Sequence, residues 1–209
     1  MYVIFNIETA VDHSSPSIAS LSVEAMKAPA GWKDPVKIAE RQEENFLKAL
    51  DGAGLHPLTG QIICLSYQTY HQGGPETVPI TFIEMTEQDI LNNFKAYIAR
   101  LDASILVTYN GELFDVPYTI SRMMAHDIPI PEVLRKASQK KWDSHIDMFK
   151  VMNKKGKLKE WASRYHLDPV FGDGSLVQGW LETGDFMSIK SHCVDNVRVT
   201  RELLRRYVG

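Results

Sequence analysis

Stretches of apolar residues with the period of a strand alternate along this chain with stretches that have the period of a helix. The apolar run at residues 3–5 predicts a buried strand, and residues 62–67 and 78–84 predict two more. These three strands are expected to form an antiparallel meander. The segment between the first two, from residue 11 to about 57, is predicted to be irregular except for a helix at residues 35–50, with Asp34 as its N-cap.

The second half of the chain alternates helices and strands. A helix capped by Thr86 is predicted to precede a fourth strand at residues 104–109, which should therefore lie parallel to an earlier strand. A short strand is predicted at residues 142–146, and further helices at residues 115–124, 158–165, 175–183 and 185–207. This order predicts a single α/β domain over residues 1–209, with a mixed central β-sheet flanked by helices and a long insertion at about residues 11–57.

Two polar side chains lie at the end of the first predicted strand. Asn6 and Glu8 are two residues apart, so they are expected to project side by side from one face. Asp115 is predicted to lie in the first turn of the helix that follows the fourth strand. Because α/β proteins hold reactive groups at the carboxyl edge of the sheet, Glu8 and Asp115 are candidates for a shared crevice. The alternatives are a strand that ends in a polar turn and a carboxylate that stabilises a helix N-terminus.

Composition and charge narrow the class of protein. The chain has 209 residues, 44% of them apolar and 23% charged, as in an ordinary globular domain. A net charge of −3 gives no overall positive field, so nucleic-acid binding would depend on local basic clusters. Residues 135–141 and 154–159 contain such clusters, which are either solvated surface or contacts for phosphates.

Cysteine content and hydropathy indicate the cellular setting. Two cysteines, Cys64 and Cys193, do not make a disulfide framework, and the chain opens on a strand rather than on a signal segment. Its apolar runs are much shorter than the roughly 20 residues that span a bilayer. We therefore expect a cytoplasmic protein with reduced thiols that does not act in a membrane.

Three short motifs, in order along the chain, resemble those of the DEDD superfamily of 3′–5′ exonucleases. They are Asn-Ile-Glu-Thr at residues 6–9, Tyr-Asn-Gly followed by Phe-Asp-Val-Pro at residues 109–117, and His-Cys-x-x-Asn-Val-x-x-Thr at residues 192–200. Residues 33–38 and 145–147 are also similar to phage and bacterial exonucleases related to the proofreading domain of family B DNA polymerases. The resemblance spans nearly the whole chain and implies a ribonuclease H-like fold.

The resemblance implies hydrolysis of phosphodiester bonds by two metal ions, Mg²⁺ or Mn²⁺, that lie roughly 4 Å from each other and are held by carboxylates. It implies catalytic roles for Glu8, Asp115 and His192. It implies metal-ligand positions at Asn6, Glu8, Asp115 and Asn196. The implied partner is the 3′ end of single-stranded DNA, with RNA as the alternative. The residues expected to contact nucleic acid are Thr9, Tyr109, Asn110, Phe114, Lys154, Lys155 and Lys157.

Three residues depart from the pattern of the superfamily. Asn6 and Asn196 stand where aspartates are expected, and His192 stands where a tyrosine is usual. Asparagine keeps one acceptor oxygen but has no charge and adds an NH₂ donor, so four carboxylates become two. We expect these residues to converge with Glu8 and Asp115 in one crevice, and the nuclease activity to be weak or absent. The alternative is an inactive nucleic-acid-binding or protein-interaction module, and the two asparagines are either natural or engineered.

Overall fold

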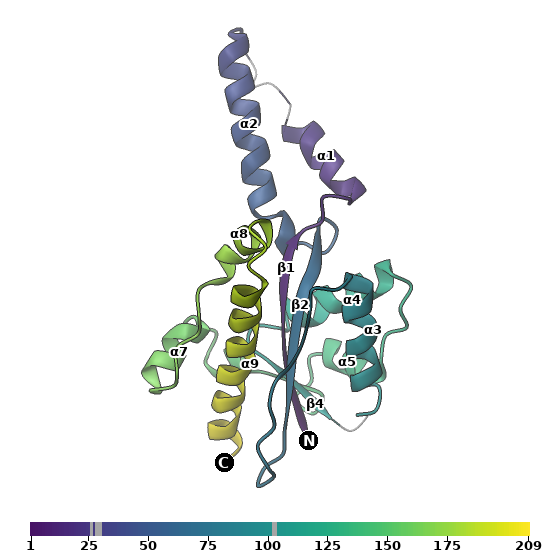
Figure 1. Cartoon of the computed structure of the whole chain (residues 1–209), viewed down its shortest axis with the longest axis vertical. Helices are drawn as coiled ribbons and strands as arrows, with labels where there is room; N and C mark the ends of the chain where they lie inside the picture. The colour runs from purple at the N-terminus through teal and green to yellow at the C-terminus, as the bar shows by residue number, and fades with distance from the viewer. Residues whose placement is uncertain (26, 28–30, 102–103) are drawn as a thin grey trace. The chain divides into compact units, whose positions relative to one another are not determined.

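The computed structural model describes residues 1–25, 27, 31–101 and 104–209 (Figure 1). The chain divides into two compact units. The larger unit consists of Met1–Glu8 and Ile62–Gly209, and the smaller unit consists of Thr9–Gln61. Strands β1 (Tyr2–Val11) and β2 (Gly60–Tyr70) each contribute residues to both units.

The described residues form a five-stranded sheet with the order β3-β2-β1-β4-β5. β3 (Ile80–Ile83) pairs antiparallel with β2, whereas β4 (Ile105–Thr108) is parallel to β1, and β5 (His145–Asp147) is parallel to β4. A helix precedes β4 and further helices precede β5, as a crossover between parallel strands requires. The predicted mixed α/β sheet is therefore confirmed, although β3 is shorter than residues 78–84.

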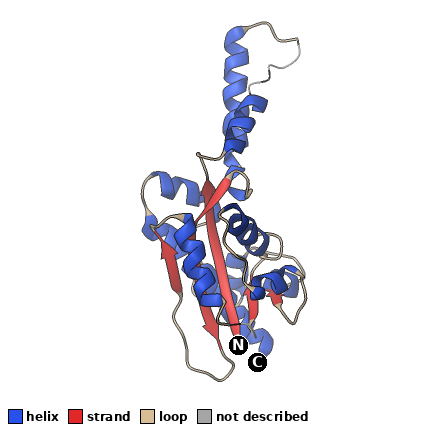
Figure 2. Ribbon diagram, turned by 90° about the vertical axis from the view of Figure 1, so that its right-hand side faces the viewer, coloured by secondary structure: helices blue, strands red, loops and turns tan. Residues whose placement is uncertain are grey.

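Helices cover both faces of the sheet in the larger unit (Figures 1 and 2). Two of them begin where predicted because a side chain accepts a hydrogen bond from the first turn. Thr86 accepts one from the backbone N–H of Asp89, and Asp185 accepts one from that of Ser188. The helices are α3 (Glu87–Ile98), α4 (Asp115–Ala125), α5 (Glu132–Ser138), α6 (Met148–Val151), α7 (Leu158–Arg164), α8 (Val177–Glu182) and α9 (Phe186–Val208), with a 3₁₀ turn η2 (Gly174–Leu176).

Alternation along β1 divides the core of the larger unit into two layers. Val3, Phe5 and Ile7 pack on one face of the sheet, in a cluster that contains the buried apolar residues of α3, α4 and α5. Ile4 packs on the other face, in a cluster that contains Val197 of α9. In Figure 1, α3, α4 and α5 accordingly lie on one side of β1 and β2, and α9 lies on the other. In the part of the chain that the structure describes, no helix is long and apolar enough to cross a membrane.

The smaller unit is more regular than predicted. The helix capped by Asp34 is confirmed as α2 (Pro35–Asp51), but residues predicted to be irregular form α1 (Pro16–Ala25) and the 3₁₀ turn η1 (Ala53–Leu55). The serines of α1 have low helix propensity, which hid this helix from a local pattern. Packing of its Ile18 in a cluster with Val11 and Ala53 offsets that propensity. Residues 26 and 28–30 of the predicted irregular segment lie outside the described residues.

Candidate active site

The carboxyl group of Glu8 is the centre of a polar cluster on the α9 face of the sheet. Asn6 and Glu8 continue the alternating series to which Ile4 belongs, so β1 directs both side chains toward that face. Glu8 is 6% exposed, and its Oε1 accepts hydrogen bonds from Asn6 Nδ2 at 2.7 Å and from Asn196 Nδ2 at 3.1 Å. The fold thus places two amide groups from distant parts of the chain on one oxygen atom.

Helix α9 presents His192 and Asn196 together because residues four apart in a helix are neighbours. The Nδ1 of His192 lies 2.6 Å from the carbonyl oxygen of Phe171. A carbonyl oxygen only accepts, so Nδ1 donates and Nε2 is the acceptor, which faces Asn196 Nδ2 at 3.3 Å and Glu8 Oε1 at 3.8 Å. Burial lowers the pKa of His192, which favours this neutral form.

Asp115 joins the cluster through the backbone of β1. It is the first residue of α4, and its Oδ1 accepts a hydrogen bond from the backbone N–H of Ile7 at 3.0 Å. Asp115 is 4% exposed, and the charge of Glu8 is close enough to act on its pKa. The structure therefore brings Asn6, Glu8, Asp115, His192 and Asn196 together, as the three motifs predicted, while their chemical roles stay predictions.

Asp147, at the end of β5, holds the turn that leads into α4. One of its carboxyl oxygens accepts hydrogen bonds from the backbone N–H groups of Asn110 at 2.7 Å and Phe149 at 3.0 Å, and the other from that of Glu112 at 3.1 Å. Gly111 lets this turn pass close to β4, because a Cβ there would overlap a side chain of the strand. In the sequence, Asp147 was noted as part of the segment at residues 145–147 that resembles exonucleases, and its hydrogen bonds to this turn were not predicted.

Burial raises the pKa of both carboxyl groups in the cluster, that of Glu8 to about 8 and that of Asp115 to about 7. The amide hydrogen bonds from Asn6 and Asn196 lower the pKa of Glu8, but by less than burial raises it. The neighbouring charge of Glu8 raises the pKa of Asp115 further. At neutral pH the cluster therefore carries less negative charge than two ionised carboxylates would give it.

The donor atoms of the cluster do not fit a pair of divalent cations. Mg²⁺ and Mn²⁺ prefer oxygen ligands, chiefly carboxylates, and in this cluster only Glu8 and Asp115 carry a carboxyl group. The NH₂ groups of Asn6 and Asn196 are directed at the Glu8 oxygen that would face an ion. Within the described ranges, no group of three or more His, Cys, Asp and Glu side chains is placed to hold a metal ion.

An aromatic rim beside His192 was not predicted from the sequence. The ring of Phe171 stacks on that of Trp180 with 5.7 Å between centroids, and the Trp180 ring lies 6.0 Å from the His192 ring. Gly172 has a φ of +67°, and a Cβ there would overlap the Trp180 ring. The segment thus curls around Trp180, and Phe171 stays 47% exposed next to the cluster. Only its position in a glycine-rich turn hinted at this.

The candidate stacking residues of the second motif are partly engaged in packing. The hydroxyl group of Tyr109 donates to the carbonyl oxygen of Gly156 at 2.7 Å, and burial raises its pKa to about 12. The ring of Phe114 lies 5.3 Å from that of Tyr118 and packs against the buried core. Asn110 is half-buried with a φ of +66°, and its backbone N–H forms one of the turn's hydrogen bonds to Asp147. Contacts of these residues with nucleic acid stay predictions.

The remaining candidates for nucleic-acid contact lie at the surface or outside the larger unit. Lys154 and Lys155 are exposed, whereas the Nζ of Lys157 lies 3.7 Å from a carboxyl oxygen of Asp173, within reach of an ion pair. Thr9 is half-buried and is the first residue of the smaller unit. The lysines therefore form a local basic surface on a chain whose net charge is −3.

The order and pairing of the strands, with helices on both faces, define a ribonuclease H-like α/β fold. The family model of the exonuclease domain of family B DNA polymerases matches residues 61–170, more than half of the chain. The chain belongs to this family. The matched range includes Asp115 and Asp147, and the residues contributed by β1 and α9 lie outside it.

Curated relatives of the chain are much longer proteins. The catalytic subunit of DNA polymerase epsilon from Schizosaccharomyces pombe is 26% identical over 149 residues, which cover 67% of this chain and 7% of that protein. The DNA polymerase of Pyrococcus glycovorans is 24% identical over 174 residues, which cover 71% of this chain and 22% of that protein. The chain thus spans less than a quarter of the length of these relatives.

A solved structure supports the fold over nearly the whole chain. The family B DNA polymerase from the hyperthermophilic archaeon Pyrobaculum calidifontis superposes with a TM-score of 0.65 at 15% sequence identity. The match covers 99% of this chain and 24% of that chain. At 15% sequence identity, this similarity is evidence for the fold of the chain alone.

Proposed function

We propose that the protein binds the 3′ end of a single DNA strand at the Glu8 cluster and that Asn6 and Asn196 make its 3′–5′ exonuclease activity weak. Membership of the polymerase exonuclease family supports an exonuclease-like function. The observation that carries the proposal is that both asparagine NH₂ groups donate to the same oxygen of Glu8. They fill with hydrogen-bond donors the space in which carboxylates would otherwise hold cations.

Charge explains why two asparagines have so large an effect. Exonuclease domains of this family depend on divalent metal ions, and two-metal hydrolysis requires carboxylates that hold both ions at once. With Asn6 and Asn196, the cluster supplies two carboxyl groups instead of four. Burial keeps Glu8 and Asp115 partly protonated at neutral pH, which reduces the negative charge further.

The residues of the chain still suit a nucleic-acid end. With Glu8 and Asp115 partly protonated and positions 6 and 196 uncharged, the cluster repels a phosphate less than four carboxylates would. A phosphate oxygen that replaced Glu8 Oε1 as the acceptor would receive hydrogen bonds from the two amide NH₂ groups. The unprotonated Nε2 of His192 is an acceptor for the 3′-hydroxyl group. The exposed ring of Phe171 offers a surface on which the terminal base stacks. DNA is proposed before RNA because the similar proteins are DNA polymerases.

A cleavage assay with the unmodified chain and four variants tests the proposal. We expect the unmodified chain to degrade a labelled single strand slowly from its 3′ end in Mn²⁺, and Asn6→Asp and Asn196→Asp to change the rate little when introduced singly. The double variant should be faster by roughly a hundredfold or more, because residues that act as a unit contribute non-additively. Asn92→Asp, which adds one charge at an exposed site on α3, is the matched control.

The outcomes separate the candidate functions. Rapid, metal-dependent cleavage by the unmodified chain, equal to that of the double variant, would disprove the charge argument. No binding of single-stranded DNA by the unmodified chain or by any of the variants, even at low salt, would favour a protein-interaction module on the same fold.

A further inference from the structure

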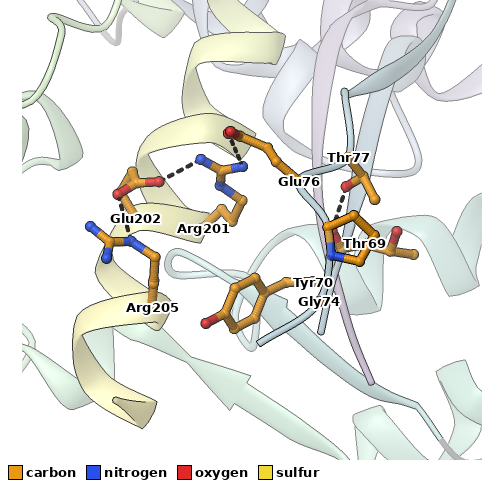
Figure 3. A pocket seen from close by; sticks show the side chains of 9 residues that line it. Thr69, Tyr70, Gly74, Glu76, Thr77, Arg201, Glu202 and Arg205 are labelled. Atoms are coloured by element: carbon orange, nitrogen blue, oxygen red, sulfur yellow. Dashed lines mark hydrogen bonds and ion pairs between the residues drawn. The ribbon is translucent and has the colours of Figure 1, made fainter. Parts of the chain in front are cut away.

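A polar cavity lies along α9, on a different side of the helix from the Glu8 cluster. It has a volume of about 390 Å³ and lies between the loop that joins β2 to β3 and the last turns of α9 (Figure 3). Arg201 follows Asn196 by five residues, which is about 7.5 Å along a helix and about 140° around it. The cavity is therefore a separate feature that the exonuclease chemistry does not use.

Arg201 is the central polar group of this cavity. Its side chain is 13% exposed, and its Nη1 is paired with Glu76 Oε1 at 2.6 Å, while its Nη2 is paired with Glu202. Figure 3 shows Arg201 between these two carboxylates, one from the loop and one from its own helix. The Nε of Arg201 is buried and has no hydrogen-bond partner among the described residues. A buried donor without an acceptor is unfavourable, so this atom favours a ligand that brings one.

A second arginine adds to the positive side of the cavity. Arg205 donates from its Nε to Glu202 Oε2 at 3.1 Å, so Glu202 holds both arginines in place. No partner is found for the terminal nitrogens of Arg205 within the described ranges, and its side chain is 53% exposed. Guanidinium groups match the geometry of carboxylate and phosphate oxygens, so two of them side by side suit an oxyanion.

Glu76 is bound in a way that lets a ligand replace it. Its side chain is 74% exposed, and an ion pair this exposed contributes little to stability. The loop that carries it has a separate anchor, because Gln72 Nε2 donates to the carbonyl oxygens of Val208 and Gly209 at 3.1 and 2.8 Å. Glu76 can therefore leave Arg201 while the loop stays attached to α9.

The lining of the cavity also includes two ring side chains, Tyr70 and Pro75, beside Thr69 and Thr77. Figure 3 shows the Tyr70 ring across the cavity from Arg201. Flat apolar rings are surfaces on which nucleobases stack. The volume also lies in the range of roughly 300–1,000 Å³ that is typical for pockets that bind organic ligands, and is larger than a bare inorganic anion needs.

We propose that this cavity binds one nucleotide unit of a single-stranded nucleic acid, with the phosphodiester on Arg201 in place of Glu76 and the base against Tyr70. Once Glu76 has left, Arg201, Arg205 and Glu202 carry a net charge of about +1, which one phosphodiester balances. A terminal phosphate, with a charge of about −1.5 to −2 at pH 7, would exceed it. The choice of nucleic acid over an acidic peptide rests on the proposed function, whereas the choice of a singly charged, ring-bearing anion does not.

The probe is the dinucleotide thymidylyl-(3′→5′)-thymidine, which has one phosphodiester and no terminal phosphate. It is titrated at low salt into the full chain while the NMR signals of the arginine Nε–H groups are followed. The Arg201 signal is identified by its loss in Arg201→Met. We expect this signal to shift on binding and Arg201→Met to weaken binding by at least roughly tenfold, as expected for loss of a hydrogen-bonded charge. The neutral methylphosphonate analogue of the probe should bind similarly weakly.

Glu76→Gln supplies the sharpest readout because it should strengthen binding. Removing the internal competitor is expected to tighten the dissociation constant roughly two- to fivefold, the range of an exposed ion pair. Glu43→Gln, the same change at an exposed site in the smaller unit, should have no effect. If Arg201→Met fails to fold, Arg205→Ala serves in its place and should weaken binding while Glu76→Gln still strengthens it.

Several results would overturn the proposal. They are an Arg201 signal that does not shift, a methylphosphonate that binds as well as the phosphodiester, and an affinity unchanged by Glu76→Gln. Tighter binding of the capped peptide acetyl-Gly-Tyr-Glu-Gly-amide would assign the cavity to carboxylates instead. Equal binding of uridylyl-uridine would support a site for both DNA and RNA, and weaker binding a site for DNA. The ring signals of His192 are followed in the same titration. A probe that shifts them and leaves the Arg201 signal unchanged binds at the Glu8 cluster, which would overturn the proposal for this cavity but not the proposed exonuclease function.

Discussion

Glu8 and Asp147 both carry buried carboxyl groups, but the two groups accept hydrogen bonds from different kinds of donor. Asp147 is 3% exposed and accepts three hydrogen bonds from backbone N–H groups, those of Asn110, Glu112 and Phe149. Glu8 is 6% exposed and accepts from two side-chain amides instead, and its pKa is raised to about 8. Both partners of Glu8 can be exchanged by substitution, whereas the partners of Asp147 are fixed parts of the chain.

This difference separates a structural carboxylate from a functional one. Asp147 organises the turn before Asp115, so replacing Asp147 should mainly lower the stability of the protein. Glu8 lies in a cluster whose charge depends on the residues at positions 6 and 196. Substitutions at positions 6, 8 and 196 should therefore mainly change the titration of the cluster, its metal binding and its activity. The following predictions test that division, starting with the largest expected effect.

Asp147→Ala should destabilise the protein most. It leaves three backbone N–H groups without their acceptor, and each such buried group costs about 1–3 kcal/mol, so we expect a loss of about 3 kcal/mol or more. For a chain of this size, this corresponds to a fall in Tm of roughly 6–12 °C in thermal unfolding. Asp143→Ala, an exposed aspartate four residues earlier, should leave the Tm almost unchanged. A Tm for Asp147→Ala within about 2 °C of the unmodified protein would contradict the structural role.

The double variant Asn6→Asp with Asn196→Asp should gain stability from Mn²⁺ that the unmodified chain does not gain. A ligand that binds only the native state stabilises it by about 2.7 kcal/mol at a hundred times its dissociation constant. Without metal the same variant should melt below the parent, because four clustered carboxylates repel one another. Thermal unfolding with Mn²⁺ and with a chelator measures both effects. Equal stabilisation of the parent by Mn²⁺ would show that the asparagines do not prevent metal binding.

Glu8→Gln should flatten the pH dependence of stability. The pKa of Glu8 rises from an ordinary value of 4.5 to about 8 in the folded state, so the folded protein binds more protons than the unfolded chain between these values. Its contribution to stability is therefore complete below about pH 4.5 and is lost as the pH rises through 8. Glutamine does not ionise, so the variant should exceed the parent in Tm at pH 8.5 by a few degrees. The stability of the variant should still decline somewhat with rising pH, because Asp115, with its pKa raised to about 7, continues to titrate.

The matched control for this prediction is Glu43→Gln, which should follow the parent at every pH because Glu43 is exposed. A Glu8→Gln variant whose Tm falls between pH 5 and 8.5 as steeply as that of the parent would show that the Glu8 carboxyl is not buried in the way described.

The smallest expected effect concerns the salt dependence of DNA binding. If Lys154 and Lys155 contact phosphates of a single strand, replacing both by alanine should reduce the slope of log K against log salt by about 1.4, or about 0.7 for each contact. Fluorescence anisotropy with a labelled oligonucleotide over a salt series measures this slope. Lys33→Ala with Lys37→Ala removes the same charge from the smaller unit and should leave the slope as it is. Equal slopes for all three proteins would show that Lys154 and Lys155 do not contact the phosphates of the strand.

Local chemistry made much of the fold predictable. Helix starts at Asp34 and Thr86 followed from capping side chains, whose hydrogen bonds reach only a few residues along the chain. The parallel placement of β4 followed from the helix before it. The motif residues at 6–9, 115 and 192–196 could likewise be assigned to a strand, a turn and a helix. All of these features depend on neighbours in sequence, which is why the sequence alone sufficed.

The tertiary structure decided what those residues do to one another. The shared contact of Asn6 and Asn196 with one oxygen of Glu8 spans 188 positions and depends on how α9 packs against β1. The raised pKa of Glu8 follows from burial, which a motif does not specify. Three further features could not be predicted from the sequence, because each depends on contacts between segments that are far apart in the chain. They are the formation of α1, the hydrogen bonds from the turn before α4 to Asp147, and the cavity at Arg201. The sequence by itself determined which residues sit on which element, and long-range packing determined their charge and their partners.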